Sequence, residues 1–201
     1  MMRTTIAFAV VMILLAHAPA QAQSWEASGL FGFTPSAAID QRASELSDAD
    51  IRGAFTWGLQ SARFFTTSLG AEVLWTQQAS AFEVGTSDGK ADLFAMTIRQ
   101  LHGNVVYRLG RADAKWQPFV FGGLGATFFT ADTVEAETKF SLDVGGGVKI
   151  FLSRLLGARA HVRYKPTFLN DSSSDTFCDP FGFCQGVLHQ IEFTAAAVLR
   201  F

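Results

Sequence analysis

The sequence predicts an all-β protein, an eight-stranded antiparallel up-and-down transmembrane β-barrel in one domain. Hydrophobic residues make up 49% of the 201 residues. Yet beyond the N-terminus no apolar run reaches the roughly 20 residues that a membrane-spanning helix requires. Apolar and polar residues instead alternate with a period of two along most of the chain. Long and short connections also alternate between these segments, as they do in barrels that span a membrane.

The N-terminal segment has the pattern of a secretory signal peptide. Arg3 supplies a positive charge, residues 6–16 are apolar, and Ala20-Gln21-Ala22 provides small residues for cleavage. The apolar stretch is short for a membrane anchor. We therefore predict a cleavable signal peptide over residues 1–22 and a barrel domain over residues 23–201.

Eight segments carry the strand signal. They are residues 25–34, 51–60, 68–76, 92–109, 118–129, 140–152, 158–165 and 190–201. In the sixth segment, for example, Leu142 and Val144 alternate with Ser141 and Asp143. The first and fifth segments alternate too irregularly to show which of their residues face inward.

The connections between these segments predict two different ends of the barrel. Long loops are expected at residues 35–50, 77–91 and 166–186, with a medium loop at 130–139, and shorter connections at 61–64, 110–115 and 153–157. Because a sheet in lipid must close to bond its own backbone, its apolar side chains face outward and its polar ones inward. A lipocalin barrel buries its apolar face inside and does not require this asymmetry.

Three segments resemble strands of a known superfamily. Residues 101–107 (LHGNVVY), 118–125 (PFVFGGLG) and 144–149 (VGGGVK) resemble the glycine-rich fourth to sixth strands of OmpA/OmpX-like outer-membrane β-barrels. The terminal Phe201, with Leu199 and Ala197 before it, is similar to the signal that the outer-membrane assembly machinery reads. The resemblance implies the outer membrane of a Gram-negative bacterium, with outer-membrane lipid, lipopolysaccharide and the assembly machinery as partners.

Charged side chains are expected inside the predicted barrel. The candidates for this lumen charge network are Arg52, Glu72, Asp143, Arg159, His161, Arg163, Lys165 and Glu192. Buried charges must be paired to be tolerated, and eight strands leave an interior just wide enough for side chains to fill. We therefore interpret the set as a plug of ion pairs, with a gated ion path or an anion site as the alternative.

The last predicted loop carries two cysteines. In an exported protein Cys178 and Cys184 are expected to form a disulfide. Phe181 and Phe183 lie between them, in a segment that Asp-Pro and glycine predict to turn. This loop is either only a rigid turn or a contact surface for an external ligand or cell-surface partner.

Several function classes are disfavoured. A net charge of −2 without a basic block argues against nucleic-acid binding. Two cysteines alone make a poor metal site, and no Ser-His-acid pattern indicates an enzyme. We expect no cofactor, no metal and no catalysis. The favoured function is a structural, envelope-stabilising or surface-interaction role, and the alternative is a narrow channel or transporter for small or hydrophobic solutes.

Overall fold

The computed structural model describes residues 24–35, 37–41, 49–51, 53–86, 89–131, 134–169 and 186–201. All regular structure in these ranges is β, with no helix long and apolar enough to cross a membrane. The strands are β1 (Ser24–Thr34), β2 (Ala37–Gln41), β3 (Ala49–Ile51), β4 (Ala54–Phe64), β5 (Leu69–Thr86), β6 (Gly89–Arg108), β7 (Trp116–Ala131), β8 (Val134–Phe151), β9 (Leu156–Leu169) and β10 (Gly186–Arg200).

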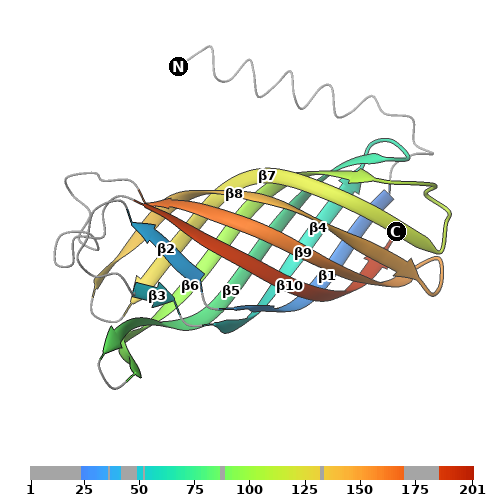
Figure 1. The fold of residues 1–201 in the computed structure, drawn as a ribbon. Coiled ribbons are helices and arrows are strands. Elements are labelled where there is room, and N and C mark those ends of the chain that lie inside the picture. Colours follow the sequence, from blue (N-terminus) through green and yellow to red (C-terminus); the bar gives the residue numbers. More distant parts are fainter. Residues whose placement is uncertain are drawn as a thin grey trace, which may run out of the picture.

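The strands form one closed barrel (Figure 1). From β4 onward each strand pairs antiparallel with the next one in the chain. β1 pairs with β4 on one side and with β10 on the other, which closes the sheet. Closure removes the free strand edges that would otherwise be left unbonded in lipid.

The ten strands correspond to eight long ones, because two of the long strands are each divided into two pieces. β2 and β3 keep the register of β1 and β4: Thr34 pairs with Ala54, and Ala37, three residues on, pairs with Ile51. The register shifts by one residue where this pair of strands meets its other neighbours. With β10, for example, the pairing changes from Phe33↔Phe193 to Ile39↔Leu188. β1 with β2 and β4 with β3 therefore each act as one strand, and the predicted eight-stranded barrel is confirmed.

Several of the predicted connections are wrong in extent. The predicted loop at 35–50 holds β2 and most of β3, and the predicted short connection at 61–64 lies within β4, which ends at Phe64. The predicted long loop at 77–91 is mostly strand, because β5 continues to Thr86 and β6 starts at Gly89. The predicted loop at 130–139 likewise shrinks, because β7 reaches Ala131 and β8 starts at Val134. Backbone pairing between adjacent strands needs no alternation of side chains, so these hairpins continue where the period-two pattern ends.

Burial shows which residues face the lumen. In β1 the even-numbered residues Glu26 and Leu30 are buried, while Phe31 is 75% exposed. In β7 the odd-numbered residues Phe119 and Phe121 are buried. The structure thus fixes the two registers that the sequence leaves open.

The strands are staggered around the barrel. Paired residues lead from Ser24 through Phe64, Gly70, Val106, Phe121, Gly145, Arg163 and Glu192. Glu192 lies beside Thr34 of β1, ten residues above the starting point, since Phe33 pairs with Phe193. Such a stagger requires strands tilted against the barrel axis. The tilt brings side chains from distant parts of the chain to one level of the lumen.

Inward-facing glycines make room for large side chains. A Cβ atom at Gly123 would lie 2.1 Å from the carbonyl oxygen of Gly103, and one at Gly147 would lie 2.1 Å from that of Ala160. Both distances are far below van der Waals contact, so a side chain at either position would displace the neighbouring strand.

The outer face is apolar between two charged positions. Among strand residues whose side chains the structure describes, Arg63 and Arg99 are the two charged ones that face outward. Arg63 lies one residue from the short-turn end of β4, and Arg99 lies nine residues from the corresponding end of β6. Exposed aromatic residues, among them Trp25 near the short turns and Phe55 near the long loops, lie toward both ends. This arrangement is typical of a barrel wall that faces acyl chains and ends in aromatic girdles.

Candidate functional site

The lumen contains charged side chains from six strands. Each of the following is at most 3% exposed: Glu26, Glu72, Arg108, Asp143, Lys149, Arg159, Arg163, Lys165 and Glu192. They occupy inward positions because each strand alternates and its apolar residues face lipid. A charge buried in so enclosed a space is costly unless it is paired. The contacts between these side chains therefore show whether the lumen is closed or could admit a solute.

Glu192 of β10 is the centre of the first group. Its carboxylate accepts hydrogen bonds from Nε of Arg163 at 2.8 Å and from Nζ of Lys165 at 2.7 Å. The hydroxyl of Thr194 donates to it at 3.0 Å, and that of Thr34 at 3.4 Å. Two cations and two hydroxyls from three strands therefore hold one carboxylate.

A second group continues from the first across the lumen. Arg163 Nη1 lies 3.7 Å from Asp143 Oδ2. The side-chain amide of Asn104 donates to Asp143 at 3.1 Å and to Glu72 at 3.3 Å. Arg159 donates to Glu72 at 2.6 Å. These contacts connect β5, β6, β8 and β9 through the interior.

Uncharged polar side chains extend the network toward the loop end. Gln100 donates to Gln190 at 3.0 Å and to Thr127 at 3.4 Å. Thr127 in turn lies 3.2 Å from the hydroxyl of Thr167. Lys165 also bonds Gln100, which joins this layer to Glu192.

A third group lies at the short-turn end. Glu26 of β1 contacts Arg108 and Arg200, each at 3.3 Å, and also Lys149. Arg108 stacks 3.9 Å above the ring of Phe64. A cation–π contact contributes about 0.5–2 kcal/mol, whereas an unpaired charge buried in protein costs several kcal/mol. The aromatic ring therefore offsets only part of the cost of burying these cations.

The structure brings together seven of the eight predicted lumen residues. Glu72, Asp143, Arg159, Arg163, Lys165 and Glu192 share the contacts above, and His161 accepts a hydrogen bond from Nε of Arg159 at 3.3 Å. The His161 ring centroid lies 5.6 Å from that of Phe121, so this histidine packs against aromatic rings. Arg52 lies outside the described residues, as do Cys178, Phe181, Phe183 and Cys184.

Sequence reasoning missed the group around Glu26. Arg108, Lys149 and Arg200 each follow the inward alternation of their own strand, which was a usable signal. Glu26 lies in the irregular first strand, so the sequence could not show that it faces these three cations.

One histidine–serine pair also lies inside. His102 Nε2 is 3.0 Å from Ser141 Oγ, but the two residues are 1% and 0% exposed. The other ring nitrogen of His102 has no hydrogen-bond partner among the described residues. The pair therefore has neither substrate access nor the carboxylate that a catalytic triad requires. No group of three or more metal-ligating side chains occurs in the described ranges.

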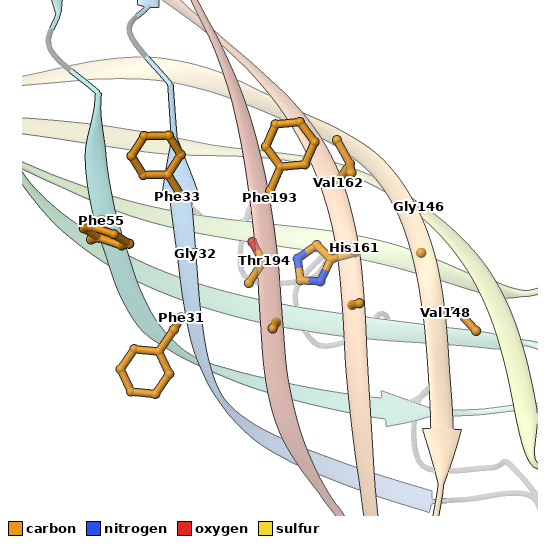
Figure 2. A pocket seen from close by; sticks show the side chains of 13 residues that line it. Phe31, Gly32, Phe33, Phe55, Gly146, Val148, His161, Val162, Phe193 and Thr194 are labelled. Atoms are coloured by element: carbon orange, nitrogen blue, oxygen red, sulfur yellow. The ribbon is translucent and has the colours of Figure 1, made fainter.

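The outer wall carries a groove of about 610 Å³ (Figure 2). Phe31, Phe33 and Phe55 lie along one side, and Val148 and Val162 along the other. Small residues such as Gly146, Ala160 and Ala195 also line it. The groove faces away from the lumen, into the layer where acyl chains pack.

Comparisons with known proteins agree with this architecture. The family model described as outer membrane protein beta-barrel domain matches residues 6–201. The structure is similar to the outer membrane protein OprG from Pseudomonas aeruginosa, at 15% identity and a TM-score of 0.61, covering 90% of this chain and 96% of that chain. It is also similar to Neisserial surface protein A (NspA), at 13% identity and a TM-score of 0.54, covering 89% of this chain and 95% of that one.

A search of the curated proteins gives no match. Identities this low show a shared fold alone. The family match, however, spans nearly the whole chain, and it agrees with the closed barrel and with the predicted resemblance to outer-membrane β-barrels. The chain therefore belongs to the outer membrane protein beta-barrel domain family.

Proposed function

We propose that this protein is a closed outer-membrane barrel with a structural, envelope-stabilising role that also presents its external loops as a contact surface. The observation that supports the proposal is the network of buried ion pairs and hydrogen bonds that crosses the lumen from Glu192 to Arg159, with the amide of Asn104 as the neutral link. Paired side chains fill the interior where a permeant solute would have to pass.

Energetics favour a plug over an open path. Separating Glu192 from Arg163 and Lys165 would leave charges unpaired at 0–1% exposure. Breaking one buried pair costs about 3–5 kcal/mol, and a path through this level would require breaking several. A narrow channel or transporter for small or hydrophobic solutes remains the alternative function.

The envelope partners follow from the outer face. Its apolar band fits outer-membrane lipid and the acyl chains of lipopolysaccharide. Leu199 and Phe201 are 53% and 71% exposed on that face, with Ala197 in line with them. We propose that these three residues form the signal read by the assembly machinery after a cleavable signal peptide at residues 1–22 has directed export.

The surface-contact part of the role concerns the loop between β9 and β10. We propose that Cys178 and Cys184 form a disulfide that presents Phe181 and Phe183 to an external ligand or cell-surface partner. The test is adhesion of cells that carry the Phe181→Ser, Phe183→Ser double variant, with surface abundance measured in parallel. Weaker adhesion at equal abundance is expected; unchanged adhesion would contradict the contact role.

The plug is tested by single-channel recording of the folded barrel in planar bilayers, with heat-modifiable gel migration to verify folding. The expected result is a folded barrel without stable openings. Openings that Glu192→Gln or Arg163→Gln alters would overturn the plug and establish the channel alternative. Openings that are identical in Arg154→Gln, an exposed turn variant, would show that the turn plays no part in them.

A further inference from the structure

The short-turn end of the lumen holds more positive than negative charge. Glu26 is the one carboxylate in contact with Arg108, Lys149 and Arg200 among the described residues. One carboxylate against three cations leaves two positive charges. The next arginine above, Arg159, does not add to this excess, since Glu72 pairs with it at 2.6 Å.

The excess charge is local to this end. In the central part of the lumen three carboxylates, Glu72, Asp143 and Glu192, face three cations, Arg159, Arg163 and Lys165. That group is balanced.

The oxygen atoms of Glu26 are already shared. Oε1 accepts from both Arg108 and Arg200, and Oε2 accepts from Lys149. The rings of Phe64 and Phe151 supply only weak compensation, with Arg108 3.9 Å and Arg200 3.3 Å from their centroids. The backbone carbonyl oxygen of Thr67 and the side-chain carbonyl oxygen of Gln117 accept from Arg108 at 2.7 Å and from Arg200 at 3.0 Å, but they carry no charge. A full counter-charge is therefore still missing, and two of the three cations, Arg108 and Lys149, are almost wholly buried.

Hydrogen-bond donors remain unused at the same place. Nε of Arg108 and Nε of Arg200 are buried without a partner among the described residues, and so is the hydroxyl of Ser28, two positions along β1 from Glu26. A buried donor without an acceptor is costly. The excess positive charge favours an anion, and the unused donors favour a hydrogen-bond acceptor. A single small anion would supply both.

We propose that a small inorganic anion, with chloride as the probe, binds among Arg108, Lys149 and Arg200 at the short-turn end of the lumen. The Arg200 side chain is 20% exposed, whereas those of Arg108 and Lys149 are 3% and 1% exposed. The anion therefore enters past Arg200 from the short-turn end, which in outer-membrane barrels faces the periplasm. This site differs from the balanced central network and does not depend on any role of the external loops.

The test measures urea unfolding of the folded barrel at increasing chloride, with sodium gluconate replacing sodium chloride so that the sodium concentration stays constant. Gluconate is too large to enter among these side chains. One anion bound only to the folded state lowers the unfolding equilibrium constant about tenfold for each tenfold rise in chloride above its dissociation constant. We expect this slope for the unmodified protein and its loss in Arg200→Gln.

Arg154→Gln is the matched control, because it removes one positive charge from an exposed turn at the same end. It should keep the chloride dependence. Equal unfolding in chloride and gluconate for the unmodified protein would overturn the site, and so would equal loss in both variants. If Arg200→Gln does not fold, the chloride-35 NMR line width decides: the unmodified barrel should broaden the line, and an absence of broadening overturns the proposal.

Discussion

Glu192 illustrates how individual side chains determine whether this lumen is closed. Its carboxylate has four hydrogen-bonding neighbours and no exposure to solvent. Charge-assisted hydrogen bonds of this kind are about twice as strong as neutral ones, and losing one partner leaves the others unpaired. The value of each charge therefore lies in the partners it satisfies.

Glu192→Gln should lower the free energy of unfolding by about 3–5 kcal/mol, because Arg163 and Lys165 would lose their shared anion. The measurement is equilibrium urea unfolding of the folded barrel. Asp113→Asn is the control, since Asp113 pairs with Arg111 at 2.9 Å in an exposed turn and its loss should not be measurable. An unchanged stability in Glu192→Gln would mean that the ion pairs do not hold the lumen together.

Adjacent glycines on β7 provide a second comparison. Gly123→Ala should destabilise the barrel by about 1–3 kcal/mol, since its Cβ would overlap the backbone of β6. Gly122→Ala should have little effect, because Gly122 faces outward and its nearest atom would lie 3.8 Å away. Unfolding curves for both variants check this, and equal effects would show that the inner wall is not tightly packed there.

At the scale of the strand, alternation predicts which residues face inward wherever the lipid side is apolar and the lumen side is polar. Strands such as β4 and β8 alternate clearly, and their inward residues follow from the sequence. β1 and β7 do not, because Gly29 and Gly32 or Gly122 and Gly123 carry no side chain that distinguishes the two faces. The extensions of β5 and β6 were missed for a related reason, since the pattern ends there while backbone pairing continues.

The lipid-facing band should reject charge at its centre. Val73 faces outward, two residues from Ala71, which pairs with Arg63, and four from Gln77, which pairs with Arg99. Val73→Arg should therefore cost about 2–4 kcal/mol in lipid bilayers.

Ala136→Arg is the matched control for that substitution, since Ala136 is exposed near the loop end of β8. It should cost only about 0–1 kcal/mol. Unfolding in lipid vesicles measures both. A tolerated Val73→Arg would place the membrane elsewhere on the barrel.

For the whole molecule, the two ends of the barrel differ: the short turns and the ends of the first and last strands lie at one end, and the long hairpins extend at the other. The N–H of Trp25 donates to the carbonyl of Phe201 at 2.8 Å, so the first and last strands end together beside the short turns. The fold and the outward face were predictable from pattern. The ion-pair partners in the lumen were only partly predictable. Which residues lie opposite each other, such as Glu26 and Arg108, depends on the stagger of the whole barrel, and the pattern of a single strand does not show it.

A circular permutant separates stability from assembly. A linker joins Phe201 to Ser24, and new ends open between Ser153 and Arg154. The permutant should refold in detergent to the same heat-modifiable form, since all strand pairs are kept. In cells, with an export signal attached, its insertion should fall several-fold because Phe201 is no longer terminal. Insertion equal to the original chain would contradict a terminal assembly signal.

The seam between β1 and β10 also sets the order of folding. Every other neighbouring pair of long strands is a local hairpin, whereas the seam joins Glu26 to Arg200 across nearly the whole sequence. Bringing such distant segments together carries an entropic cost of about 4–5 kcal/mol. The seam should therefore close last, in the slow kinetic step, and until it closes the sheet exposes two unbonded edges that can pair with another chain.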